Sequence, residues 1–183
     1  MALLDTLPAT ATPIATLRDR FRGGKAELIE HFRSSRPTTT SVAKLLRELA
    51  RHVNATLQEL WQASGMPTGA ALLAVGGYGR GELFPHSDVD VLVLLPPTMV
   101  HAADDPATHA TLSGFITACW DIGLEIGSSV RTIEDCIAEA RKDVTVQTAL
   151  LESRFLYGSR RLFNAFRHAN TEVMDARAFL RAK

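Results

Sequence analysis

The feature that most constrains this chain is a strand–turn–strand segment in which glycines and acids border apolar runs. It reads AVGGYGRGELFPHSDVDVLVLL and covers residues 74–95. The unbroken apolar run at residues 91–95 is typical of a strand buried on both faces. Asp88 and Asp90 open that strand, and their side chains project to one face because strand side chains alternate. Two carboxylates beside a buried strand need a partner, and a metal–nucleotide complex would supply one.

The glycines of this segment follow a predicted strand at residues 70–75. Gly76 and Gly77 would allow backbone N–H groups to approach a phosphate closely. The motif is not a dinucleotide-binding fingerprint, because no GxGxxG starts at Gly77 or Gly79, and no GK[ST] follows it. A tight structural turn accounts for the glycines alone equally well.

A third acid, Glu125, lies in the run LEIGSSVR, residues 124–131, which predicts a central strand of the sheet. Alternation places Glu125 on the same face as Arg131. Guanidinium groups match phosphate oxygens, so Arg80 and Arg131 are predicted triphosphate contacts, and Ser87 is a predicted nucleotide contact beside the first aspartate. Each residue taken singly has an ordinary alternative, namely an edge-strand carboxylate facing water or an arginine in a surface ion pair.

The rest of the chain reads as helices with apolar positions at helical spacing. We expect a helix over residues 14–32 that kinks or breaks at Gly23-Gly24, and a long one that starts at Ser41 as its N-cap. Further helices are expected over residues 108–121, after Thr132 with Asp135 in a capping box, over 144–156 and over 160–183. The predicted domains are a helical region at 1–66, a core at 67–158, and the start of another helical segment at 159–183.

The amino-acid composition and the net charge bear on which classes of function the chain can have. The formal net charge of the 183 residues is zero, which favours neither a nucleic-acid surface nor a basic membrane patch. No apolar run is long enough for a transmembrane helix, and the first residues do not form a signal peptide. Cys119 and Cys136 are predicted to be buried reduced thiols, which fits a cytoplasmic protein. Trp61 and Trp120 are expected in the core, and His86 in solvent.

The segments GGYGRGELFPHSDVDVLVL and WDIGLEIGSSVRTIEDCIAEARKDVTVQTALLESRFLYG resemble the bacterial PII uridylyltransferases, the bifunctional uridylyltransferase/uridylyl-removing enzymes. The wider superfamily is the DNA-polymerase-β-like nucleotidyltransferases. The resemblance implies an α+β fold, with a small mixed β-sheet backed by helices. It also implies that Gly76 and Gly77 hold the triphosphate, that Asp88 and Asp90 bind metal, and that Glu125 stands for the third carboxylate. Gly77 replaces the superfamily's serine, and Glu125 replaces its commoner aspartate.

The reaction implied is transfer of UMP from UTP to a tyrosine hydroxyl of the PII protein, with two Mg²⁺ ions. The family's HD-type hydrolase and ACT domains are expected to be absent, since the chain has no HD pair. The predicted last helix ends without a stop signal, so we expect the chain to be a piece of a longer protein. Two alternatives stay open from the residues. One is a related transferase that uses another nucleotide or acceptor, and the other is a truncated domain that binds nucleotide without catalysis.

Overall fold

The computed structural model describes residues 13–99 and 105–173, which divide into two compact units. We call them the helical unit (Met1–Met66, Gly81–Val89 and Pro106–Ile126) and the sheet unit (Pro67–Arg80, Asp90–Asp105 and Gly127–Lys183). Each unit is therefore assembled from three separate stretches of sequence. The sequence also predicts a small, polar, proline-containing leader at residues 1–13, and that leader falls almost wholly outside the described residues.

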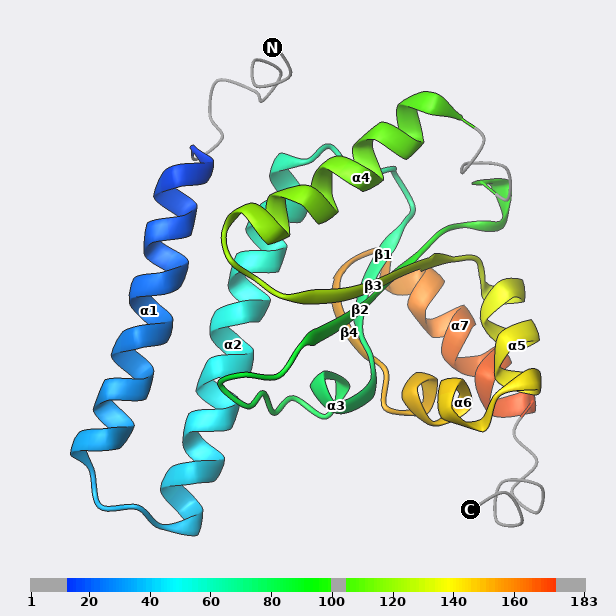
Figure 1. The fold of residues 1–183 in the computed structure, drawn as a ribbon. Coiled ribbons are helices and arrows are strands. Elements are labelled where there is room, and N and C mark those ends of the chain that lie inside the picture. The colour runs from blue at the N-terminus through cyan, green and yellow to red at the C-terminus, as the bar shows by residue number, and fades with distance from the viewer. Residues whose placement is uncertain (1–12, 100–104, 174–183) are drawn as a thin grey trace. The chain divides into compact units, whose positions relative to one another are not determined.

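The helical unit is built from α1 (Ile14–Ser34), α2 (Thr39–Ala63) and α4 (Pro106–Asp121). The first two lie side by side (Figure 1). Apolar stripes of these helices form a core in which the Trp61 and Phe115 rings meet edge to face, their centroids 5.7 Å apart. Trp61 is buried as predicted, whereas Trp120 is 61% exposed, so its prediction as a core residue is wrong.

Two local predictions in this unit need correction. Helix α1 runs without a break through Gly23-Gly24, and the glycine at 24 serves close packing: a Cβ there would lie 2.5 Å from Cε1 of His52. Helix α2 starts one turn earlier than predicted, because its N-cap is Thr38. The Thr38 hydroxyl accepts from the Ser41 N–H at 3.1 Å and the Ser41 hydroxyl accepts from the Thr38 N–H at 2.8 Å, which forms a capping box.

The sheet has the strand order β3–β2–β1–β4. Strand β1 (Ala71–Ala74) pairs antiparallel with β2 (Val89–Leu94) and with β4 (Arg154–Gly158). Strands β2 and β3 (Ile126–Arg131) run parallel, since the N–H groups of Val89 and then Leu95 donate to the carbonyls of Glu125 and then Arg131. The predicted α+β fold with a small mixed sheet is confirmed.

One face of this sheet carries the core of the sheet unit. Leu73 of β1 and Leu92 of β2 are fully buried in a cluster with Phe166. That cluster draws on α5 (Ile133–Lys142), α6 (Val144–Leu151) and α7 (Arg160–Val173). A single turn of 3₁₀ helix, Pro97–Met99, follows β2. The burial of β1 and of residues 91–94 of β2 on both faces agrees with their unbroken apolar sequences.

The sheet also corrects two predictions. The helix expected over 144–156 ends at Leu151, and the residues after it form β4, a strand that the sequence pattern did not reveal. Strand β3 lies at the edge of the sheet, not in its centre. Glu125 therefore stands just before an edge strand and is exposed, as in the ordinary alternative for this residue. The capping box between Thr132 and Asp135 at the start of α5 is confirmed.

In the described part of the chain, no helix combines the length and the apolar character that crossing a membrane requires.

Candidate active site

The glycine turn forms one short helical turn, α3 (Gly76–Gly79), directly after β1. Gly76 has φ of 56°, a conformation that side chains with a Cβ seldom adopt. Gly79 has no room for a Cβ, which would lie 1.8 Å from the backbone carbonyl oxygen of Glu152. The turn therefore needs glycine for its own backbone geometry, and of its four residues Gly77 is the exposed one.

Asp90 is brought against this turn by the pairing of β1 with β2. The Val75 N–H donates to the Asp90 carbonyl at 3.0 Å, and a Cβ at Gly76 would lie 3.5 Å from Oδ2 of Asp90. On the other side, a Cβ at Gly127 of β3 would lie 2.5 Å from Oδ1. The exposed Asp90 carboxylate therefore occupies a space that two glycines leave free.

A cleft of about 360 Å³ in the sheet unit opens over this carboxylate. Gly76, Asp90 and Arg131 line it together, so the structure gathers three of the predicted site residues. Its other walls come from β3 and from α6, through Ser129 and Ala149. The volume lies within the ~300–1,000 Å³ range of small-molecule sites. A guanidinium and a carboxylate in one cleft suit a ligand that carries both phosphate and metal.

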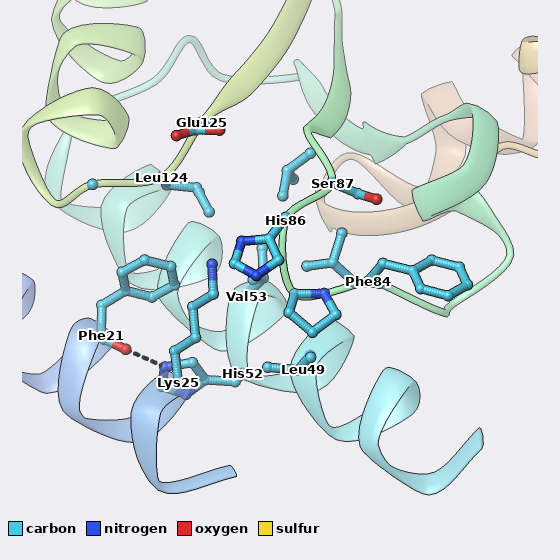
Figure 2. A pocket seen from close by; sticks show the side chains of 14 residues that line it. Phe21, Lys25, Leu49, His52, Val53, Phe84, His86, Ser87, Leu124 and Glu125 are labelled. Carbon is cyan, nitrogen blue, oxygen red and sulfur yellow. Dashed lines mark hydrogen bonds between the residues drawn. The ribbon is translucent and has the colours of Figure 1, made fainter. Parts of the chain in front are cut away.

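The other predicted acids belong to the helical unit. Asp88 is exposed immediately before β2. The Val89 N–H donates to the Glu125 carbonyl at 2.9 Å, which ties the start of β2 to the segment that carries Glu125. Ser87 and Glu125 line a smaller cavity of about 100 Å³ (Figure 2). Ser87 and Glu125 are thus brought to one cavity of the helical unit.

No group of three or more His, Cys, Asp or Glu side chains that could hold a metal ion is found among residues 13–99 and 105–173. The predicted trio of Asp88, Asp90 and Glu125 is therefore not assembled as a ready-made three-ligand group. Their chemistry still fits a hard divalent cation, which prefers carboxylate oxygens, and Asp90 presents its oxygens to an open cleft. The carboxylate oxygens of these residues are therefore ligands of the type that Mg²⁺ prefers.

Arg80 and Glu152 form an ion pair at 2.7 Å. The Arg80 side chain is 58% exposed and lies in the sheet unit with the glycine turn, but it does not line the cleft. The sequence also suggests an ion pair between Glu152 and Arg154; in the structure Glu152 pairs with Arg80, and the Arg154 guanidinium donates to backbone carbonyls. Gly77 has an ordinary contact only, since a Cβ there would lie 3.5 Å from the Arg80 guanidinium.

Arg154 is a site residue that the sequence analysis missed. Its guanidinium donates to the carbonyls of Gly79 and Tyr78, both at 3.2 Å, and lies over the Tyr78 ring, 5.3 Å from the centroid. Burial raises the pKa of Tyr78, although the nearby Arg154 opposes that rise. Arg154 thereby anchors the glycine turn from β4. Its position in a strand was hidden because residues 144–156 read as one helix.

Comparisons with known proteins match this chain to nucleotidyltransferases. Residues 51–118 match the family model described as a nucleotidyltransferase domain. A bifunctional uridylyltransferase/uridylyl-removing enzyme of Cupriavidus pinatubonensis is 50% identical over 98% of this chain, which spans 20% of that protein. The enzyme with the same description from Burkholderia vietnamiensis is 52% identical over 91% of this chain, which spans 18% of that protein. The one from Burkholderia thailandensis is 47% identical over 96% of this chain, which spans 19% of it.

Proposed function

Because the chain belongs to the family of bifunctional uridylyltransferase/uridylyl-removing enzymes and carries their nucleotidyltransferase domain, we propose that it transfers UMP from UTP to a tyrosine of the PII protein. The chain spans about one fifth of these relatives, and the proposal assigns it the transferase step alone. The observation that carries it is the Asp90 carboxylate beside Gly76 in a cleft large enough for a nucleotide.

Each predicted residue receives a role in this proposal. Asp88 and Asp90 would hold Mg²⁺, and Glu125 would complete the nucleophile-side ligands or accept the proton. When bound there, divalent cations would acidify the acceptor hydroxyl and neutralise charge on the departing pyrophosphate. Gly76 and Gly77 would present backbone N–H groups to the triphosphate.

The basic side chains complete the nucleotide site. Arg131 lines the cleft and would pair with phosphate oxygens. Arg80 would have to leave Glu152 to do the same, and Ser87 would contact the nucleotide from the loop before Asp88. In the transfer itself, the tyrosine oxygen bonds to the α-phosphorus and the α–β phosphoanhydride bond breaks, which releases pyrophosphate. The hydroxyl proton leaves to Glu125 or to solvent, and the protein contributes mainly position and charge.

We place this reaction in the cytoplasm, where thiols stay reduced. Cys119 and Cys136 are both free and buried. Two other functions remain as outcomes of the test: a transferase with another nucleotide or acceptor, and a domain that binds nucleotide without transfer.

The test is label transfer by the 183-residue chain. The chain is incubated with Mg²⁺, PII and UTP or ATP labelled at the α-phosphate, beside the Asp88→Asn/Asp90→Asn variant. Glu134→Gln, an exposed acid of α5 that lines neither cavity, is the matched control. We expect label from UTP alone, lost in the double variant and kept in the control. Label from ATP would point to another nucleotide specificity, and metal-dependent UTP binding without label would reduce the function to binding.

A further inference from the structure

The helical unit contains a second cavity, of about 100 Å³, that the nucleotide cleft does not include (Figure 2). Helices α1 and α2, the loop before β2 and the segment before β3 enclose it. Its apolar walls include Phe21, Leu49, Val53 and Leu124, and its polar lining includes Lys25, His52, His86, Ser87 and Glu125. The volume is well below the ~300–1,000 Å³ of sites that hold a whole small molecule, so it suits one side chain rather than a nucleotide.

One wall of this cavity is held in a fixed arrangement. The His52 ring stacks on the Phe21 ring with 5.4 Å between centroids and 5° between planes, and its Nε2 lies 2.8 Å from the Phe21 carbonyl oxygen. Gly24 leaves the space that the His52 ring fills. The aromatic wall therefore exists before any ligand arrives, and its half-buried member, His52, is the part that another ring could contact.

The polar lining of the cavity carries one basic and one acidic side chain, Lys25 and Glu125. The Lys25 side chain is half-buried and, in Figure 2, its amino end and the His86 ring point into the same space. Glu125 contributes the carboxylate of the lining, and Ser87, which also lines the cavity, directly precedes Asp88. The polar lining therefore offers a ligand one ammonium group and one predicted catalytic carboxylate.

We propose that this cavity binds the aromatic ring of the acceptor side chain, a tyrosine, with Lys25 donating to its hydroxyl oxygen. The inference rests on the proposed function, because it assigns the acceptor of that transfer to a particular cavity. A phenol fits the lining: its ring packs against the half-buried His52 and the apolar walls, and its oxygen, which gains negative charge as its proton leaves, lies beside the ammonium. Glu125, to which the proposed function gives the role of metal ligand or proton acceptor, lines this same cavity.

The first test measures binding without catalysis. N-acetyl-tyrosinamide, N-acetyl-phenylalaninamide and uridine are titrated separately into the labelled 183-residue chain, and NMR shifts at the cavity residues are followed. We expect the tyrosine amide to shift them and to bind about tenfold more tightly than the phenylalanine amide, because only tyrosine has the oxygen that Lys25 contacts. Lys25→Met should remove that preference and Val53→Phe should fill the cavity, whereas Lys44→Met on α2, whose partner is Glu48, should change neither. Shifts from uridine alone, or from none of the three, would overturn the proposal.

The second test uses transfer kinetics with PII. Lys25→Met should raise the KM for PII about tenfold and leave the KM for UTP unchanged, whereas Lys44→Met should leave both unchanged. A rise in the KM for UTP instead would assign the cavity to the nucleotide and reject the inference. If the chain transfers no label yet the tyrosine amide still occupies the cavity, the proposed function fails while the binding site stands.

Discussion

The carboxylate of Asp90 rests over the Cα of Gly127 on the neighbouring strand. A Cβ at position 127 would lie 2.5 Å from Oδ1 of Asp90, which is closer than real Cβ atoms approach an oxygen. The atom that must move is the end of a flexible side chain, so relief is available without any backbone change. The position of a predicted metal-binding carboxylate thus depends on the absence of a side chain across the strand pair.

The substitution Gly127→Ala should therefore impair function more than folding. We expect transfer or metal-dependent UTP binding to fall about tenfold or more, because Asp90 is pushed from its place, while the urea midpoint changes little. Gly114→Ala in α4 is the matched control, since a Cβ there has nothing within 4 Å. If Gly127→Ala keeps full UTP affinity in the presence of Mg²⁺, the role given to Asp90 is wrong.

Gly79→Ala, by contrast with Gly127→Ala, should mainly lower the stability of the fold. Its Cβ would lie 1.8 Å from the Glu152 carbonyl oxygen, a backbone atom that cannot move alone. We expect a loss of about 1–3 kcal/mol or more in the free energy of unfolding, measured by urea titration with circular dichroism. Gly77→Ala, with an ordinary contact at 3.5 Å, is the comparison and should lose less. Equal stability of the two variants would contradict the described packing of α3 on the residues after α6.

Arg154 should act as a positioning residue for the glycine turn. Arg154→Ala removes both hydrogen bonds to the turn and leaves the Gly79 and Tyr78 carbonyls without that donor. We expect about 1–3 kcal/mol of lost stability together with a raised KM for UTP. Arg154→Lys keeps the charge but not the forked geometry, so it should restore stability better than it restores the KM. A variant that loses stability alone, with an unchanged KM for UTP, would limit Arg154 to a structural role.

The capping box of α5 should make stability depend on pH. Thr132 donates from its backbone N–H at 3.0 Å and from its hydroxyl at 2.8 Å to Asp135, and these bonds lower the pKa of Asp135. A carboxyl whose pKa is lowered by folding stabilises the protein above its unfolded pKa of ~3.9, and that contribution disappears as the pH falls through the folded pKa. Thr132→Ala should therefore cost about 1 kcal/mol near neutral pH.

The measurement is urea unfolding of wild type and Thr132→Ala at several pH values between neutrality and about pH 3. The part of the stability difference that comes from the Asp135 charge should shrink in the acid range. Thr145→Ala at the start of α6 is a suitable comparison, since the Asp143 carboxylate there accepts from the Thr145 backbone N–H, a bond that alanine keeps. A difference that grows as the pH falls would reverse the sign of the Asp135 argument.

The sequence predicted those parts of the fold that depend on neighbours in the chain. The strand around Leu73, the buried strand through Leu92 and the capping box at Thr132 all have local signals, and all are present. Strand β4 has only five residues, and its partner β1 lies far away in the chain, so nothing local separates it from the preceding helix. Trp120 was misplaced because helical spacing alone does not show which part of a helix is covered.

The candidate site also combines residues that the sequence predicted with contacts that it could not predict. The motif located Gly76 and Asp90 and the cleft-lining Arg131, because a glycine turn and alternating acids are visible in sequence. The anchoring contacts of Arg154 and the aromatic wall made by His52 require distant segments to meet, and sequence periodicity carries no information on such meetings. Gly24 is an example. The sequence pattern predicted a helix interruption there, whereas in the structure the missing side chain leaves space for the His52 ring of another helix.

The link between β4 and the glycine turn bears on how the protein is made. The carbonyls of Gly79 and Tyr78 receive their hydrogen bonds from a residue that is 75 and 76 positions later in the chain. During synthesis the glycine turn therefore leaves the ribosome long before its anchor does. Until Arg154 has emerged and β4 has docked on β1, the turn lacks its final restraint, so binding of nucleotide to the nascent chain should begin only after that point.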